Sequence, residues 1–343
     1  MRWRGAGVVL AGTLVLAGCG SGDGGDDAGG SDGADGGGGT DGSTVEAPGQ
    51  VIDAAAASIT PASSGAGTIV APCHERLCAW DVGGPLLADD WVADDADVTA
   101  TAWSADGATL AVAAAGPGQV LLLDGATGEE ITAVDVPGTV AALAFDPMGP
   151  RLAVGTADGV TVLDVTSPEQ TLPDATVTAV TGDVVDLAYT ADGGRLAVAY
   201  ADTAPQVHDA STYAELLTLG DAPALRVSWD DAGDRLATAG PDGATVVGGA
   251  DGEVVDSWDD AEVTDVAFEP GAAGTSGLAL ATADNRVLLW QPGGEATALG
   301  EGVAPTRALL WSGGLYGAAD DVVSKWRTEA SPRSYDLDLP PFD

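Results

Sequence analysis

The sequence is poor in basic residues. Its 343 residues include 12 Lys and Arg against 53 Asp and Glu, which gives a formal net charge of −41. Nucleic-acid binding is disfavoured, because a phosphate backbone needs a basic protein surface. Extended contact with anionic lipid is disfavoured for the same electrostatic reason.

The side chains that most often carry catalysis are also scarce. Histidine occurs only at His74 and His208, and asparagine only at Asn285. No Ser-His-Asp set, His-Glu-x-x-His helix, glycine-rich phosphate loop or dinucleotide fingerprint is present. Carboxylates are abundant, so a two-carboxylate hydrolase stays open, although no pair stands out from the turns. We expect no enzyme activity and no cofactor, with a divalent cation at acidic loops as the remaining alternative.

No apolar run is long enough to span a bilayer. The run Val8–Ala17 follows Arg2 and Arg4, and its length suits the core of a signal peptide. It ends in Leu16-Ala17-Gly18-Cys19, which resembles the lipobox of bacterial lipoproteins of actinobacterial type. In that family the Cys is diacylated and becomes the mature N-terminus. The resemblance predicts a signal peptide over residues 1–18 and lipidation at Cys19.

The N-terminal sequence has one alternative interpretation, an ordinary secretory signal followed by a chance Cys. With lipidation, the protein is anchored to the cell membrane on its extracytoplasmic face, and touches the membrane through the lipid anchor only. The next segment, residues 19–44, consists almost entirely of Gly, Asp and Ser after the Cys. Such a composition cannot bury enough apolar surface to offset chain entropy, so we expect a disordered tether.

Only three cysteines are present. With Cys19 assigned to lipid, Cys73 and Cys78 remain, and they flank a predicted tight turn between two strands. In an oxidising compartment we predict a disulfide between them. The alternative is a metal site formed by Cys73, His74 and Cys78. Such a site needs a fourth ligand or water, and the adjacent Cys73 and His74 are poorly spaced for a structural site.

One pattern repeats along the rest of the chain. The stretch Thr101–Val112 reads as strand, Asp-Gly turn and strand, and similar stretches return four times. Each copy begins with an aromatic residue, and these are Trp103, Phe145, Tyr189, Trp229 and Phe268, at spacings of 42, 44, 40 and 39 residues. A period near forty with several short strands per unit is typical of a β-propeller blade.

A second mark, an apolar strand ending in Trp, Asp or Gly, occurs seven times between Leu77 and Trp326. Here the chain resembles WD-repeat β-propellers, because Trp80-Asp81 is the namesake dipeptide of that family and the Ala-Asp-Gly turns match its hairpin. The family's Gly-His pair is missing, and most units have another residue in place of Trp. The resemblance predicts an all-β, seven-bladed β-propeller of four-stranded antiparallel blades over residues 45–343, and we expect a monomer.

The acidic residues fall in particular loops of this repeat. In a propeller, the loops that enter each inner strand share a face with the loops between the second and third strands. These loops predict an acidic rim of Asp94, Asp95, Asp97, Asp158, Asp183, Asp202, Asp242, Asp259, Asp260, Asp284, Asp320 and Asp321, with Glu75, Asp135, Asp221, Glu262 and Glu301 beside them. The rim would attract a cation or a basic partner. A general acidic bias that aids solubility is the alternative.

These patterns favour a propeller that binds a protein or a cell-envelope component through its acidic rim. Two other functions stay open. One is a metal-dependent hydrolase or lactonase of propeller type. The other is a solute-sensing lipoprotein whose ligand lies in the central channel among inward-facing residues such as Thr99, Thr101 and Asp186.

Overall fold

The computed structural model describes residues 60–61, 68–73, 76–81, 86–88, 91, 98–114, 118–166, 172–177, 180–271, 276–301, 306, 308–311, 314–318, 323–326 and 335–336. The chain divides into two units, Met1–Pro48 and Gly49–Asp343, and every described residue belongs to the second. The predicted signal peptide, Cys19 and tether lie outside the described residues.

The described residues form β-strands and no helix. The strands make seven antiparallel sheets of four, and each sheet takes four strands that are consecutive in the chain. The predicted all-β fold of four-stranded antiparallel sheets is confirmed, and seven sheets fit the seven repeat units. The described part of the chain contains no helix of the length and apolarity needed to cross a membrane.

The sheets are numbered here one to seven in chain order. Sheets one to three contain β1 (Thr60–Pro61), β2 (Thr68–Cys73), β3 (Arg76–Asp81) and β4 (Leu86–Ala88); β5 (Val98–Trp103), β6 (Thr109–Ala114), β7 (Gln119–Asp124) and β8 (Glu130–Asp135); β9 (Val140–Phe145), β10 (Arg151–Thr156), β11 (Gly159–Asp164) and β12 (Leu172–Val177).

Sheets four to seven continue the same order. They contain β13 (Val184–Tyr189), β14 (Arg195–Tyr200), β15 (Gln206–Asp209) and β16 (Glu215–Thr218); β17 (Arg226–Trp229), β18 (Arg235–Gly240), β19 (Gly243–Gly248) and β20 (Val254–Trp258); β21 (Val263–Phe268), β22 (Leu278–Thr282), β23 (Arg286–Trp290) and β24 (Ala296–Glu301); β25 (Ala308–Trp311), β26 (Leu315–Ala318), β27 (Val323–Trp326) and β28 (Tyr335–Asp336).

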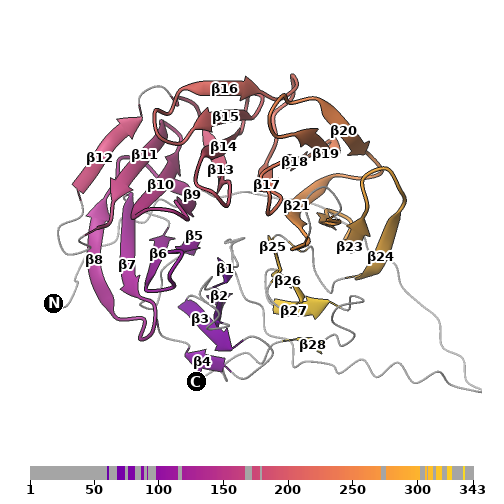
Figure 1. Cartoon of the computed structure of the whole chain (residues 1–343). Coiled ribbons are helices and arrows are strands. Elements are labelled where there is room, and N and C mark those ends of the chain that lie inside the picture. The colour runs from indigo at the N-terminus through magenta and orange to yellow at the C-terminus, as the bar shows by residue number, and fades with distance from the viewer. Residues whose placement is uncertain are drawn as a thin grey trace, which may run out of the picture. The chain divides into compact units, whose positions relative to one another are not determined.

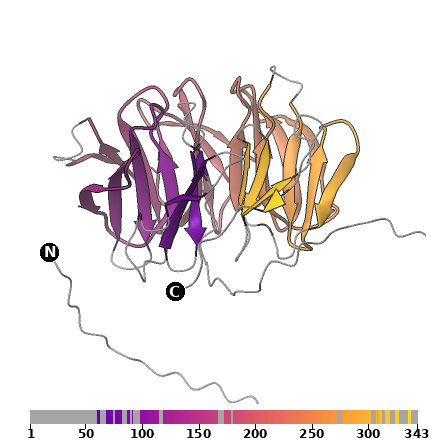
Figure 2. The same cartoon turned by 90° about the horizontal axis from the view of Figure 1, so that it is seen from below.

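The seven sheets stand around a common centre. Figure 1 shows the first strand of each sheet nearest the centre and the fourth strand at the periphery. From β5 to β25, each first strand lies beside the first strand of the next sheet. Figure 2, turned by 90°, shows the strands running between the same two edges of the ring. Every loop therefore belongs to one edge or the other.

The predicted aromatic anchors all occupy one structural position. Trp103, Phe145, Tyr189, Trp229 and Phe268 are the last residues of β5, β9, β13, β17 and β21. Trp229 donates its indole N–H to the carbonyl oxygen of Ala188 in the preceding sheet at 3.1 Å, and Trp311 at the end of β25 does the same to Ala267 at 3.1 Å. The repeat period of the sequence thus corresponds to one sheet of the fold.

The second strands form the buried middle of each sheet. Leu110, Ala111, Val112 and Ala113 in β6 are all 0% exposed. Such near-continuous apolar runs suit strands that are covered on both faces by neighbouring sheets. Small residues also allow close packing: a Cβ added to Gly155 in β10 would lie 2.5 Å from a methyl carbon of Val184 in the next sheet.

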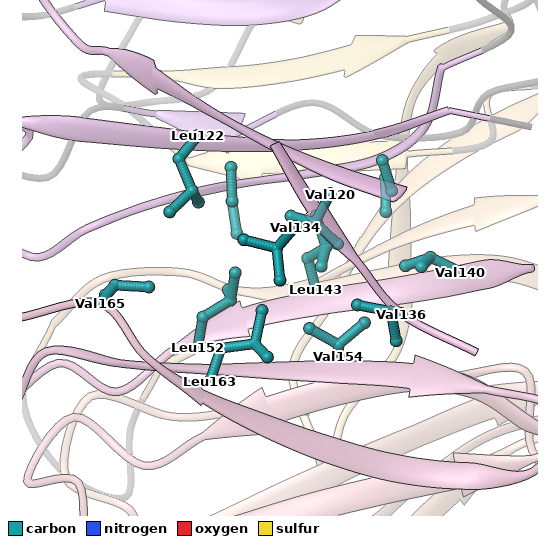
Figure 3. Close-up of a cluster of buried hydrophobic side chains, with 14 of the residues drawn as sticks. Val120, Leu122, Val134, Val136, Val140, Leu143, Leu152, Val154, Leu163 and Val165 are labelled. Carbon is teal, nitrogen blue, oxygen red and sulfur yellow. The ribbon is translucent and has the colours of Figure 1, made fainter. Parts of the chain in front are cut away.

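Apolar side chains fill the spaces between the sheets. Figure 3 shows the cluster between sheets two and three, where Leu122 and Val134 of one sheet face Leu152 and Leu163 of the other. Each fully buried Leu or Val contributes about 1.5–3 kcal/mol. This packing explains why apolar residues continue through most strands of the chain.

The ring closes through packing of sheet one against sheet seven. Ile69, Ala71 and Trp80 form one buried cluster with Leu310 and Tyr316. Each of these two sheets is built from its own four consecutive strands. Closure at this point therefore rests on side-chain contacts between sheets.

The outer strands carry a repeated irregularity. In sheets one to six, the register between the third and fourth strands shifts once, which marks a β-bulge. In sheets four and five the extra residues are Leu216 and Val255, and they are 49% and 55% exposed. Bulges interrupt a free strand edge and hinder its pairing with another chain. The exposed apolar residues are thus part of an edge that is protected by its geometry.

The predicted Asp-Gly turns are confirmed. Gly107, Gly193 and Gly243 follow Asp106, Asp192 and Asp242, and their φ angles are +69°, +66° and +108°. Glycine adopts these backbone conformations without the steric cost that a Cβ imposes.

Candidate functional site

Two edges of the ring are distinguished by their loops. The acidic edge, as named here, contains the loops that enter each first strand and the turns between second and third strands. Backbone hydrogen bonds join these loops: Ala201 donates to the carbonyl of Asp183 at 2.8 Å, and Ala283 donates to Glu262 at 3.0 Å. The opposite edge, named the turn edge, contains the hairpins between first and second strands and between third and fourth strands.

The structure describes seven of the twelve predicted rim residues. All seven lie in loops of the acidic edge of sheets three to six and are exposed, and they are Asp158, Asp183, Asp202, Asp242, Asp259, Asp260 and Asp284. Asp221 and Glu262 lie exposed in the same loops. Asp94, Asp95, Asp97, Asp320 and Asp321 lie outside the described residues. The described carboxylates therefore form an arc over four neighbouring sheets.

Most carboxylates of this arc make no internal contact. Asp284 accepts hydrogen bonds from Thr282 Oγ1 at 2.5 Å and from Arg286 Nε at 2.8 Å. Within the described residues, no hydrogen bond or ion pair involves the carboxylate of any other member of the arc. These groups are consequently available to a binding partner.

The turn edge uses its aspartates differently. Asp106, Asp192 and Asp209 each accept the backbone N–H two residues further along the chain, at 2.9–3.0 Å. Asp124, Asp164 and Asp251 do the same in other turns. Hydrogen bonds from Ser211, Thr212 and their backbone N–H groups lower the pKa of Asp209 to about 2. These six aspartates of the turn edge therefore stabilise the loops that contain them.

Three arginines of the turn edge connect neighbouring sheets. Arg151, Arg195 and Arg235 begin the second strands of sheets three, four and five. Each donates to a backbone carbonyl of the next sheet: Arg151 to Ala210 at 3.1 Å, Arg195 to Gly233 at 2.5 Å and Arg235 to Ser276 at 3.1 Å. Three of the 12 basic residues of the chain thus contribute to the packing of neighbouring sheets.

Two of these arginines also pair with buried carboxylates. Asp146 is 2% exposed and lies 2.6 Å from Arg151, and Asp230 is 2% exposed and lies 3.1 Å from Arg235. The guanidinium of Arg235 also lies 5.0 Å from the ring centroid of Phe268. Paired in this way, the charges are tolerated in the interior.

A third group of charges lies on the inner strands. Asp186 of β13, Arg226 of β17 and Asp265 of β21 each stand three residues before the aromatic anchor of their strand. The same position holds alanine in β5 and β9. Asp186 is one of the inward-facing residues expected from the sequence, whereas Arg226 and Asp265 were missed. Alignment of the repeats on their aromatic residues is the signal that finds all three.

The three side chains join successive inner strands. Asp186 Oδ2 accepts the N–H of Val227 at 2.9 Å, and Asp265 Oδ2 accepts the N–H of Leu309 at 2.6 Å. Arg226 Nε lies 3.6 Å from Asp265 Oδ1. Burial raises the pKa of Asp186, while Arg226 opposes the rise. Burial, opposed by Arg226 and reinforced by Asp186, raises the pKa of Asp265 to about 7.

The two threonines expected near the centre are part of the packing between sheets. Thr99 donates its hydroxyl to the carbonyl oxygen of Val140 in the next sheet at 2.8 Å, and Thr101 is 3% exposed. In the same way, Thr264 donates its hydroxyl to the carbonyl oxygen of Thr306 at 2.7 Å. Hydroxyl groups therefore satisfy carbonyls at the free edge of inner strands.

The predicted cysteine and histidine positions are only partly described. Cys78 is buried and disulfide-bonded, and it pairs with Ala71 across β2 and β3, whereas Cys73 pairs with Arg76. The side chain of Cys73 and the whole of His74 lie outside the described residues, so the Cys73–Cys78 disulfide stays a prediction. His208 is a buried residue of β15 whose Nδ1 lies 3.2 Å from the carbonyl oxygen of Tyr213.

Metal-binding side chains do not gather in the described part of the chain, where no group of three or more His, Cys, Asp or Glu could hold an ion. Burial lowers the pKa of His208, which favours the neutral imidazole. The described arrangement offers exposed carboxylates on one edge and a partly buried charged group at the centre.

Comparison with known proteins shows similarity at the level of fold. No family model and no curated protein matches the sequence. One chain from a crystal structure of a mitotic checkpoint complex is 21% identical with a TM-score of 0.67, and the match covers 82% of this chain and 93% of that one. The β-propeller domain of Cps50 (Swd1) from Myceliophteria thermophila is 16% identical with a TM-score of 0.63, and the match covers 77% and 92%. These matches support a β-propeller fold for this chain.

Proposed function

We propose that this protein is a membrane-anchored extracytoplasmic β-propeller that binds a basic protein or cell-envelope partner through its acidic edge. The observation that carries the proposal is the arc of exposed carboxylates on sheets three to six, of which only Asp284 makes an internal contact among the described residues. Carboxylates gathered on one surface attract a basic partner and accelerate its association at low salt. The role is one of binding, and the scarcity of histidine in the sequence supports it.

Charge neutralisation on the two edges tests the binding surface. One variant changes Asp158, Asp183, Asp202 and Asp242 to Asn. The matched control changes Glu129, Glu130, Glu253 and Glu295, which lie exposed on the turn edge, to Gln. Both variants lose four negative charges, so only the position of the lost charge differs.

The measurement is binding of a short oligolysine peptide, and of envelope proteins in a pull-down, at low and at high salt. We expect the acidic-edge variant to lose about tenfold in affinity at low salt and the turn-edge variant to retain most of it. Equal losses in both variants would show that net charge alone attracts the partner. Binding that is unchanged by salt would exclude an electrostatic surface.

The anchor is tested separately from the binding surface. We expect wild-type protein to incorporate labelled fatty acid and to fractionate with membranes, because Cys19 follows a lipobox-like sequence. The variant Cys19→Ser should be released from the membrane fraction. Lipid anchoring would be contradicted if that variant stayed with the membranes or if wild-type protein incorporated no label. Neither outcome would bear on binding by the acidic edge.

A further inference from the structure

The charged group at the centre of the ring contains more acid than base. Asp186 and Asp265 supply two carboxyl groups, and Arg226 between their strands supplies one guanidinium group. Asp265 is 8% exposed, and the side chain of Arg226 is 25% exposed. Asp186 is half-buried, so one buried and one half-buried carboxylate share one cation. The negative charge left over lies at a partly buried site, which is energetically unfavourable.

Neither carboxyl group can turn away from this arrangement without losing a hydrogen bond. Asp186 Oδ2 accepts from Val227 of β17, and Asp265 Oδ2 accepts from Leu309 of β25. These two bonds connect sheet four to sheet five and sheet six to sheet seven. The orientation of both carboxyl groups is therefore set by the same contacts that hold the inner strands together.

The neighbouring strands supply no other charge to Asp265 among the described residues. Arg226 faces it from β17 and Asp186 acts on it from β13. On β22 the residue paired with Asp265 is Ala281, and β25 contributes only a backbone N–H. A proton on one carboxyl group is the simplest way to balance the charge, and two coupled carboxyl groups titrate as a pair.

We propose that Asp186, Arg226 and Asp265 hold one exchangeable proton, located mainly on Asp265, and that its release weakens the packing of β17, β21 and β25. The group is thus a pH-sensitive element at the inner end of the loops that form the acidic edge. The proposal goes beyond the binding function, because it concerns the stability of the ring itself and involves no partner.

The direction of the pH effect follows from proton linkage. The pKa of Asp265 is raised to about 7, above the ordinary value of 3.8 that the unfolded chain is expected to show. The folded state therefore binds the proton more tightly than the unfolded state. The resulting stability is fully present below about pH 4 and is lost as pH rises from there to about 7.

The variant Asp265→Asn tests this proposal directly. Asparagine keeps a carbonyl oxygen for the N–H of Leu309 and imitates the protonated carboxyl group in charge. We expect the wild-type melting temperature to fall relative to that of D265N by about 5 °C between about pH 5.5 and pH 8.5. Asp242→Asn on the acidic edge is the matched control for loss of one carboxylate. A wild-type to D265N difference that is equal at both pH values would overturn the proposal.

Two further variants keep the test decisive if D265N fails to fold. Asp186→Asn removes the neighbouring negative charge, so the pH at which the proton is released and stability is lost should fall. Arg226→Gln removes the cation, so that pH should rise. Shifts in the same direction, or none, would contradict a proton shared by this group. A merely structural role predicts destabilisation without opposite shifts.

The proton itself can be observed by infrared difference spectroscopy. At about pH 6 we expect a C=O stretching band of a protonated carboxyl group in wild-type protein, which disappears at about pH 8.5 and is missing from D265N. Peptides that contain Val227 and Leu309 should exchange amide hydrogen faster at the higher pH after correction for intrinsic rates. A wild-type spectrum without the band would overturn the proposal. Neither measurement needs a partner, so failure here leaves the proposed edge binding intact.

Discussion

The two edges of the ring carry the same sign of charge but use it in different ways. On the turn edge, Asp209 and Asp230 accept N–H groups of their own loops, and Asp230 also pairs with Arg235, which reaches the next sheet. On the acidic edge, carboxylates such as Asp202 and Asp242 are exposed and make no internal contact within the described chain. The difference teaches that acidic residues of one protein can stabilise the loops on one surface and stay exposed, without internal contacts, on another.

The largest effect is expected from removal of Asp230, a buried carboxylate of the turn edge. Asp230 accepts from the N–H groups of Asp234 and Arg235 and from Arg235 Nε. We expect Asp230→Ala to lower the free energy of unfolding by about 3–5 kcal/mol, because it leaves a buried guanidinium group without its carboxylate. Urea unfolding measures the change. The removal of Asp242 by the same substitution is the control, and equal effects of the two changes would end the distinction between the edges.

A smaller effect appears when the turn edge is titrated with acid. The pKa of Asp209 is lowered to about 2, so its stabilising contribution is present above the ordinary value of 3.8 and is lost as pH falls through about 2. We expect the stability difference between wild-type protein and Asp209→Asn to change between about pH 4 and pH 2. Thermal unfolding across that interval measures it. A constant difference would indicate that the hydrogen bonds from Ser211 and Thr212 do not favour the ionised carboxylate.

The smallest expected effect on stability is on the acidic edge. Reversal of two charges there, by Asp202→Lys with Asp242→Lys, should change the free energy of unfolding by no more than about 0.5 kcal/mol for each site, because exposed side chains without specific contacts contribute little. The same variant should lose affinity for the oligolysine peptide. Substantial unfolding by this variant would show that the acidic edge also supports the fold.

Much of the fold can be predicted from local patterns. The spacing of Trp103, Phe145 and Tyr189 predicts one sheet per repeat, because each aromatic residue ends the first strand of its sheet. The Asp-Gly pairs predict tight turns for a reason that lies within a few residues of backbone. The placement of Asp158 and Asp202 on one edge follows from the alternation of strand direction within each unit.

The charged group at the centre is harder to predict. Arg226 and Asp265 stand 39 residues apart in sequence, and each is an ordinary polar residue within its own strand. Nothing in either local stretch indicates that Asp265 lies near Asp186 or accepts a hydrogen bond from Leu309. The two uses of aspartate are equally difficult to separate, since Asp192 and Asp242 both precede glycine in a turn, yet only Asp192 accepts a hydrogen bond there.

The sequence by itself determined the repeating unit, the alternation of strands and turns, and the excess of acid, because each depends on residues close together in the chain. The tertiary structure alone decided which charges meet across sheets, which carboxylates stay exposed, and how sheet one packs against sheet seven. Those outcomes depend on contacts between residues about forty or more positions apart. Such contacts exist only once the repeating units have packed around a common centre.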